Sequence, residues 1–228
     1  MKAMVLAAGR GDRLRPLTDR CPKPLIKVAG KELMAYHLEK LRAAGITDIL
    51  VNSAWLHQQI VDFLGDGSRF GVHITHSVEG ETGLETAGGI IRALPFFEGR
   101  PFLVVNGDTF IDNDYSAFLN YTLKEGENAH LYLIKNPPHN LKGDFSITPD
   151  GHLAFGGDYT FSGTAIYRPQ PFEGYEVQKL PLLNFFKEWI GQGTASAQFA
   201  DLKWFDVGTV ERLAELEQYL KNKGQAGT

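Results

Sequence analysis

The sequence predicts an α/β protein in which a largely parallel sheet is covered by helices on both faces. Short apolar segments typical of strands alternate with longer segments whose apolar residues recur at helical spacing. Glycine-containing loops separate the two kinds of segment. Because 228 residues with 43% hydrophobic content can form one substantial core, we expect a single domain over 1–228.

The first half of the chain, residues 1–121, shows this alternation most clearly. An apolar strand over 4–6 leads into a glycine-containing loop, and apolar side chains at helical spacing predict an amphipathic helix over 33–44. Gly45 marks the end of that helix. The further elements expected in this half are strands over 49–51, 72–76 and 102–105 and helices over 57–64 and 83–93.

The second half, residues 122–228, shows a different pattern, in which short expected strands are joined by loops. A proline-aspartate-glycine turn over 149–151 separates two of these strands. Thr209 is the expected N-cap of the last helix. The elements expected here are strands over 129–134, 145–147, 153–155, 161–167 and 195–199 and helices over 180–190 and 210–223.

Composition and charge argue against several classes of protein. The net charge is −4, and the cations of interest are local to the first loop, which argues against a nucleic-acid-binding protein. No apolar run approaches the length of a membrane span, and the N-terminus lacks the features of a signal peptide. The single cysteine, Cys21, has no partner pattern for a nucleophile or a zinc site. We therefore expect a cytoplasmic protein with no membrane partner.

The most informative motif is the loop after the first strand. The run L-A-A-G-R-G-D-R-L-R-P-L-T over 6–18 is followed by P-K-P-L over 22–25. Glycine backbone N–H groups can surround phosphate oxygens while Arg and Lys neutralise their charge, so the loop predicts a polyphosphate site.

Two better known phosphate loops do not fit this run. In a Walker loop the second glycine is followed by Lys and then Ser or Thr, but Gly11 is followed by Asp12 and Arg13. A dinucleotide-binding loop needs a third glycine where this sequence has Leu14.

The remaining pattern, G-x-G-x-R-L-x-P-L-T with P-K-P-L downstream, resembles the signature of the sugar-1-phosphate nucleotidyltransferases. These enzymes make nucleotide sugars from a nucleoside triphosphate and a sugar 1-phosphate, which the resemblance implies as partners. It also implies a Rossmann-like mixed, mainly parallel sheet flanked by helices, the nucleotide-diphospho-sugar transferase fold. Nucleotide would bind to residues 1–121 and sugar to 122–228, in a monomer or small homo-oligomer. The sequence lacks the hexapeptide repeats of a C-terminal β-helix.

The chemistry of such a reaction requires positive charge around the phosphates. A sugar-phosphate oxygen attacks the α-phosphorus while pyrophosphate leaves, so negative charge accumulates on oxygens at both ends. The resemblance implies that Asp108 in V-N-G-D-T and Asp206 in W-F-D-V-G-T hold a divalent metal, and oxygen ligands suit Mg²⁺. Either aspartate could instead be a turn residue. Lys23 is the candidate to contact the α-phosphate and the attacking phosphate, and Arg13 matches the arginine that grips the β- and γ-phosphates.

Nucleotide and sugar contacts are expected at several further positions, and Lys23, Arg13 and Asp108 are the expected catalytic residues. Gly88 lies in a segment that could instead be a glycine-bearing helix start of no chemical role, and Lys179 could equally be a surface lysine. The expected nucleotide-binding residues are Ala8, Gly9, Gly11, Asp12, Arg13, Lys23, Asn52, Thr86 and Gly88. The expected sugar-binding residues are Asn106, Asp144, Gly163 and Lys179.

Three segments point to a narrower group within the family. L-E-T-A-G-G over 84–89, V-N-S-A-W over 51–55 and G-D-F over 143–145 resemble the uridylyltransferases that act on N-acetylmuramic acid 1-phosphate in peptidoglycan recycling. Glu85, where many guanylyl-transferring relatives have glycine, argues against GTP. The alternatives are a mannose-1-phosphate guanylyltransferase, a glucose-1-phosphate thymidylyltransferase or a nucleotide-sugar sensor without turnover. The presence of Lys23, Arg13, Asp108 and Asp206 together argues against the sensor, because a protein that only binds nucleotide sugars does not need this full set of cations and carboxylates.

Overall fold

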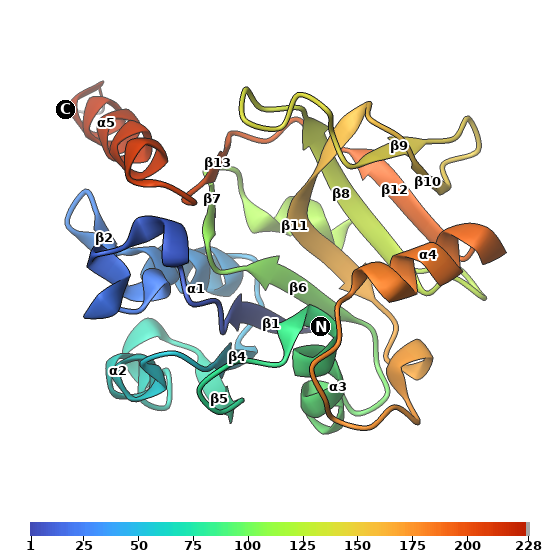
Figure 1. Ribbon diagram of the computed structural model, residues 1–228, viewed down its shortest axis with the longest axis horizontal. Coiled ribbons are helices and arrows are strands. Elements are labelled where there is room, and N and C mark those ends of the chain that lie inside the picture. The colour runs from blue at the N-terminus through green and yellow to red at the C-terminus, as the bar shows by residue number, and fades with distance from the viewer. Residues whose placement is uncertain (227–228) are drawn as a thin grey trace.

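The computed structural model describes residues 1–226 and confirms the α/β prediction (Figure 1). At its centre, β1 (Lys2–Ala7) pairs in parallel with β4 (Asp48–Ser53) on one side and with β6 (Phe102–Asn106) on the other. β5 (His73–Val78) extends the sheet in parallel beside β4. Because these strands run in the same direction, the residues that follow β1, β4 and β6 emerge at one edge of the sheet.

The other strands make this nine-stranded sheet mixed. β11 (Tyr159–Tyr167) pairs antiparallel with β6, β8 (Ala129–Lys135) pairs antiparallel with β11, and β12 (Ala195–Phe199) runs parallel to β8. The hairpin of β9 (Phe145–Ile147) and β10 (Leu153–Phe155) joins at one end of β11. One sheet therefore continues from the first half of the chain into the second.

Helices cover both faces of the sheet, as the sequence predicts. α1 (Leu33–Ala43) and α2 (His57–Leu64) bury their apolar side chains in one core cluster. α3 (Glu85–Phe97) and α4 (Leu183–Gln192) contribute to a second cluster on the other face. α5 (Val210–Ala226) lies at one end of the molecule and packs on a smaller cluster (Figure 1).

Two pairs of very short strands were not expected. β7 (Thr109–Ile111) pairs with β13 (Trp204–Asp206), and β2 (Lys27–Val28) pairs with β3 (Lys31–Glu32). Strands of two or three residues are too short to show an alternating pattern. The β7–β13 pair matters for the site because it joins the segment after β6 to the segment before α5.

The boundary error that bears on the site concerns α4, which begins three residues later than expected. The backbone N–H of Leu180 donates to the carbonyl of Leu84, and the Leu180 carbonyl accepts from the N–H of Ala87. Residues 178–182, here called the strap, are therefore held across the start of α3 and cannot join α4. Apolar residues at helical spacing do not reveal such a long-range pairing.

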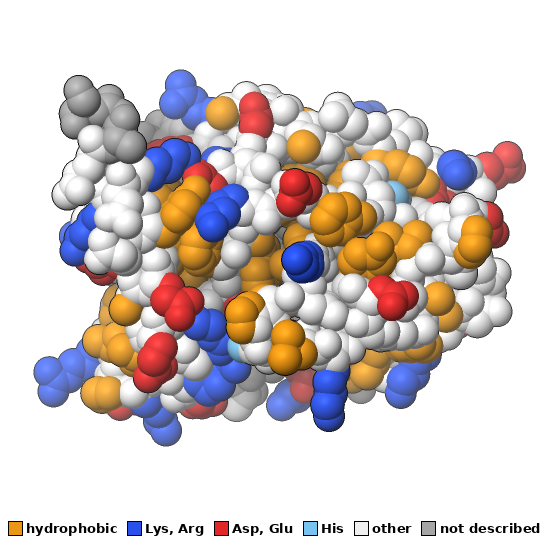
Figure 2. Space-filling view, turned by 90° about the horizontal axis from the view of Figure 1, so that it is seen from above, with side chains coloured by type: hydrophobic (Ala, Val, Ile, Leu, Met, Phe, Trp, Pro, Cys, Tyr) orange, Lys and Arg blue, Asp and Glu red, His pale blue; other side chains and the backbone are white. Residues whose placement is uncertain are grey.

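The surface carries both apolar and charged groups. Figure 2 shows hydrophobic side chains gathered over the right half of the molecule, where Figure 1 places β8 to β12 and α4, with acidic and basic groups among them. Of the helices that residues 1–226 form, none is long and apolar enough to cross a membrane.

Candidate active site

A cavity of about 630 Å³, here called the main cavity, opens at the edge of the sheet where β1, β4 and β6 end. Ligands of open α/β sheets bind at such an edge because the loops that follow the strands converge there. The candidate residues that line the cavity are Ala8, Gly9, Gly11, Asp12, Arg13, Lys23, Asn52, Thr86, Asn106, Asp108 and Lys179.

The loop after β1 is held in shape by its own sequence. Gly11 has a φ of 73°, and a Cβ at this position would lie 2.9 Å from Cγ2 of Thr18. The Thr18 hydroxyl donates to the Gly11 carbonyl at 2.8 Å, and Leu14 is completely buried below the loop. The leucine and threonine of the motif therefore anchor the loop, while its glycines leave space above it.

Arg10 is committed to contacts within the protein. Its guanidinium lies 3.8 Å from the ring centroid of Trp55 and donates to the Thr18 carbonyl and to Asp19, each at 2.8 Å. The Arg10 hydrogen bond, followed by that of Arg15, holds the pKa of Asp19 below its usual range. Arg10 therefore stabilises the loop.

Arg13 differs from Arg10 in having no partner. Within residues 1–226 its guanidinium forms no hydrogen bond and no ion pair. Its Nη2 lies 3.1 Å from the position that a Cβ on Gly208 would occupy, so the side chain reaches the segment between β13 and α5. An unpaired guanidinium that lines a cavity is available to an anion.

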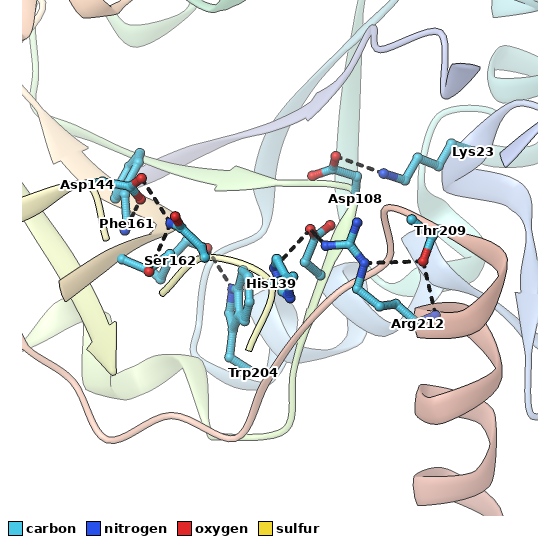
Figure 3. Close-up of polar contacts among 12 residues, drawn as sticks. Lys23, Asp108, His139, Asp144, Phe161, Ser162, Trp204, Thr209 and Arg212 are labelled. Carbon is cyan, nitrogen blue, oxygen red and sulfur yellow. Dashed lines mark hydrogen bonds and ion pairs between the residues drawn. The ribbon is translucent and has the colours of Figure 1, made fainter. Parts of the chain in front are cut away.

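Lys23 and Asp108 form an ion pair in the lining of the main cavity. Lys23 lies between two prolines in a short helical turn, is 6% exposed, and places Nζ 2.9 Å from Oδ2 of Asp108 (Figure 3). Asp108 follows Gly107, where a Cβ would lie 2.6 Å from the carbonyl oxygen of Leu6. The glycine therefore allows the chain after β6 to pass close to β1, which places the Asp108 carboxylate beside the lysine.

Asp206 is brought next to Asp108 by the short β7–β13 pair. Asp206 lies opposite Thr109, and the N–H of Val207 donates to the carbonyl of Asp108 at 3.0 Å. The Asp206 carboxylate forms an ion pair with Arg212 and lies 3.4 Å from Nε2 of His139 (Figure 3).

His139 belongs to this cluster although the sequence did not single it out. Its ring stacks on Trp204, with centroids 6.1 Å apart, and faces Asp206. Burial, followed by the Arg212 guanidinium, lowers the pKa of His139, so the imidazole is neutral at pH 7. The loop over 136–144 carries no pattern that would have indicated this position.

The two aspartates fit a divalent cation by the chemistry of their donors. Mg²⁺ is commonly held by one or two carboxylates and completes its coordination with substrate phosphates and water. Asp108 and Asp206 provide two carboxylates on adjacent backbone segments. In the part of the chain that the structure describes, no group of three or more His, Cys, Asp or Glu side chains is placed to hold a metal without substrate.

Asn52 lines the main cavity but also organises its wall. Its Oδ1 accepts the N–H of Ala7 and its Nδ2 donates to Glu79, both at 2.8 Å. The other oxygen of Glu79 accepts the N–H of Leu84 at 2.8 Å. Glu79, which sequence reasoning missed, therefore joins the end of β4 to the start of α3.

Gly88 is not a lining residue of the main cavity. A Cβ on Gly88 would lie 2.1 Å from the carbonyl oxygen of Gln178, so the glycine allows the strap to cross α3 at close range. This crossing places Lys179 in the lining of the cavity, with Nζ 3.8 Å from Oε1 of Glu85. The role of Gly88 in the structure is to position the strap.

A second cavity of about 420 Å³, here called the side cleft, adjoins the main cavity and shares Glu85, Thr86 and Asn106 with it. Gly163 lies in its wall at an irregularity of β11, where a Cβ would lie 2.6 Å from Nδ2 of Asn106. The other residues that line the side cleft are Val104, Phe161, Tyr167, Pro181, Leu182, Leu183 and Phe186.

Tyr167 is a lining residue of the side cleft whose hydroxyl is unpaired within the described chain. The residue is 1% exposed, lines the cleft, and its hydroxyl has no hydrogen-bond partner within residues 1–226. Burial raises the pKa of Tyr167, so the hydroxyl stays protonated and can donate. Sequence reasoning missed this residue because a tyrosine in an apolar strand has no distinguishing pattern.

Asp144 lies outside both cavities. Its carboxylate accepts the N–H of Phe161 at 2.8 Å and the amide of Asn140 at 3.0 Å (Figure 3). The side chain therefore ties the loop before β9 to β11. The structure does not bring it together with the other expected sugar-binding residues.

Comparison with known proteins decides the family. Residues 2–145, more than half of the chain, match the family model described as nucleotidyl transferase. The chain belongs to this family. It is 51% identical over 224 residues to the N-acetylmuramate alpha-1-phosphate uridylyltransferase of Neisseria meningitidis serogroup B. The aligned region covers 95% of this chain and 97% of the relative.

More distant nucleotidyl transferase relatives agree with this assignment. The chain is 37% identical over 158 residues to a UTP--glucose-1-phosphate uridylyltransferase of Synechocystis sp., covering 64% of this chain and 40% of that protein. The crystal structure of HddC from Yersinia pseudotuberculosis has a TM-score of 0.81 at 24% identity, with 96% of this chain and 99% of that chain covered. This structural likeness shows the shared fold.

Proposed function

We propose that this nucleotidyltransferase transfers the uridylyl group of UTP to N-acetylmuramic acid 1-phosphate, with release of pyrophosphate. The identity of 51% over nearly the whole length of a relative with that named activity supports the choice of substrates. The observation that carries the reaction type is the convergence of Lys23, Asp108 and the unpaired Arg13 on one cavity.

The protein groups match the charges that develop in the reaction. As the sugar-phosphate oxygen attacks the α-phosphorus, negative charge builds on the departing pyrophosphate. Arg13, which has no protein partner, binds the β- and γ-phosphates. The Lys23 ammonium, held by its proline-flanked turn and by Asp108, binds the α-phosphate and the incoming phosphate. Charges that are already in place need no reorganisation during the reaction.

Asp108 and Asp206 would hold the divalent cation. Because both donors are carboxylate oxygens, we propose that this cation is Mg²⁺. When bound, the cation supplies further positive charge at the phosphates. Lys23 and Arg212 neutralise the two carboxylates within the protein and keep them oriented.

The side cleft is the proposed place for the sugar. Its mouth offers Asn106, Thr86 and Glu85, and the rest of its lining is apolar apart from Tyr167. No lysine, arginine or histidine lies in the described lining of the cleft, so burying a carboxylate there would be costly. A neutral acetamido group fits this lining better than the lactyl carboxylate of N-acetylmuramic acid, which we place toward the mouth of the cleft.

The remaining parts of the proposal follow from the same substrates. We propose that the enzyme acts in peptidoglycan recycling, in the cytoplasm, as a monomer or small homo-oligomer. We propose that nucleotide contacts lie on residues 1–121 and sugar contacts on residues 122–228 together with Asn106. Nucleic acid and membranes are not among the proposed partners.

Pyrophosphate release with Mg²⁺, four nucleoside triphosphates and a panel of sugar 1-phosphates tests the function. We expect UTP to exceed GTP at least about tenfold in kcat/KM, which corresponds to about 1.4 kcal/mol of transition-state binding. Equal rates would contradict uridylyl specificity. Tight nucleotide binding without release from any pair would support the sensor instead.

A further inference from the structure

Glu85 occupies a backbone conformation that is unfavourable for its side chain. It is the first residue of α3 and has a φ of 59°, in the left-handed region that favours glycine. The other non-glycine residues with positive φ in residues 1–226 are Ala29, Leu56 and Glu98. Of these four, Glu85 lies in the candidate active site, and strained residues of this kind are often kept for function.

The position of Glu85 is the boundary between the two cavities. It lines the main cavity and the side cleft, together with Thr86 and Asn106. A sugar 1-phosphate whose phosphate lies in the main cavity and whose ring lies in the cleft would cross this boundary. The carboxylate is therefore close to where the anomeric phosphate must pass.

A single cation faces the Glu85 carboxylate within the described chain. Nζ of Lys179 lies 3.8 Å from Oε1 of Glu85, and the two side chains are 63% and 43% exposed. The Lys179 backbone is fixed, because the strap is bonded to the first turn of α3 through Leu180 and rests on Gly88. The Lys179 side chain, in contrast, is long and exposed, so its direction depends on a partner.

We propose that Glu85 is a positioning residue that orients the Lys179 ammonium into the main cavity to receive the phosphate of the sugar substrate. This inference rests on the proposed function, in which a sugar 1-phosphate is the second substrate. Glycine would relieve the strained backbone at this position but would leave Lys179 free to turn to solvent. The unfavourable φ is thus retained because the carboxylate is needed there.

Steady-state kinetics of Glu85→Gln and Glu85→Gly test the proposal. We expect both variants to raise the KM for the sugar 1-phosphate about threefold to fivefold, which corresponds to the free energy that an exposed ion pair contributes. The KM for UTP and kcat should change little. In a Lys179→Met background, Glu85→Gln should have no further effect, because the interaction it removes is already absent. An unchanged or lowered KM for the sugar 1-phosphate, or an equal effect in both backgrounds, would overturn the proposal.

The fold offers a matched control at the other end of α3. Glu98 also has a positive φ, 54°, and its Oε1 lies 3.2 Å from Nζ of Lys2, far along the helix from the cavity lining. Glu98→Gly and Glu85→Gly should both unfold at temperatures no lower than the wild type, and Glu98→Gly should leave all kinetic constants unchanged. A lower unfolding temperature for Glu85→Gly alone would show a structural role and overturn the positioning role.

Substrate identity is separated from the role of Glu85 by the choice of ligand. If the wild type does not turn over N-acetylmuramic acid 1-phosphate, the proposed function fails. The role of Glu85 is then tested by calorimetric measurement of the binding of α-glucose 1-phosphate. This ligand has the anomeric phosphate but lacks the acetamido and lactyl groups of N-acetylmuramic acid 1-phosphate. Weaker binding to Glu85→Gln than to the wild type supports the positioning role, and equal binding contradicts it.

Discussion

The phosphate end and the sugar end of the site are built in different ways. At the phosphate end, Gly11, Arg13, Thr18 and Lys23 lie within thirteen residues of chain, and the loop that carries them is held by local contacts such as the bond from Thr18 to Gly11. At the sugar end, Glu85, Asn106, Tyr167 and Lys179 come from four different segments, namely α3, β6, β11 and the strap. Strand pairing and the strap bring these segments together.

This difference predicts how substitutions at the two ends should behave. Groups at the phosphate end act on charges that change during the reaction, so their loss should lower kcat or act on both substrates. Groups at the sugar end hold a part of the substrate that does not react. Their loss should therefore raise the KM for the sugar 1-phosphate and leave the handling of UTP intact.

The largest effect is expected from Asp108→Asn. This change removes a carboxylate that pairs with Lys23 and is a proposed metal ligand. We expect kcat to fall on the order of 10² to 10³-fold, as for other groups that stabilise transition-state charge, with an unchanged circular dichroism spectrum. Asp62→Asn, at an exposed position of α2, is the control and should retain full activity. Near-normal turnover of Asp108→Asn would remove Asp108 from the reaction.

A smaller and sharper contrast is expected between two arginines of the same loop. Arg13→Met should lower kcat/KM for UTP about 30-fold, since a charged hydrogen bond contributes roughly 2 kcal/mol, and should not change thermal stability. Arg10→Met should mainly lower stability, because Arg10 contacts Trp55, Thr18 and Asp19. Thermal melts and initial rates of both variants check this. The opposite result would exchange the roles assigned to the two arginines.

The phosphate end could be predicted from sequence because its constraints are local. The spacing of glycine, arginine and proline in 9–25 determines both the loop and its charges. Asp108 and Asp206 were found as family motifs, although their meeting depends on a β7–β13 pair too short to predict. Tyr167 and Glu79 were missed and Asp144 was placed in the wrong surroundings, because their partners are set by strand register and by loops over long sequence distances.

The smallest effect, and the most direct test of the sugar end, is expected from Tyr167→Phe. The change removes a hydroxyl that has no hydrogen-bond partner within residues 1–226, so the folded protein loses no internal bond and should be as stable as the wild type. If that hydroxyl donates to the sugar, KM for the sugar 1-phosphate should rise about fivefold, the equivalent of one neutral hydrogen bond of about 1 kcal/mol. KM for UTP should stay the same.

Tyr132→Phe is the matched control for this measurement. Tyr132 is also 1% exposed, but its hydroxyl donates to the carbonyl of Phe118 at 2.8 Å. Its loss should lower stability by about 1 kcal/mol and leave both KM values unchanged. If Tyr167→Phe instead resembled Tyr132→Phe, with lower stability and unchanged kinetics, Tyr167 would belong to the core alone, and the sugar would have to be held by the residues at the mouth of the cleft.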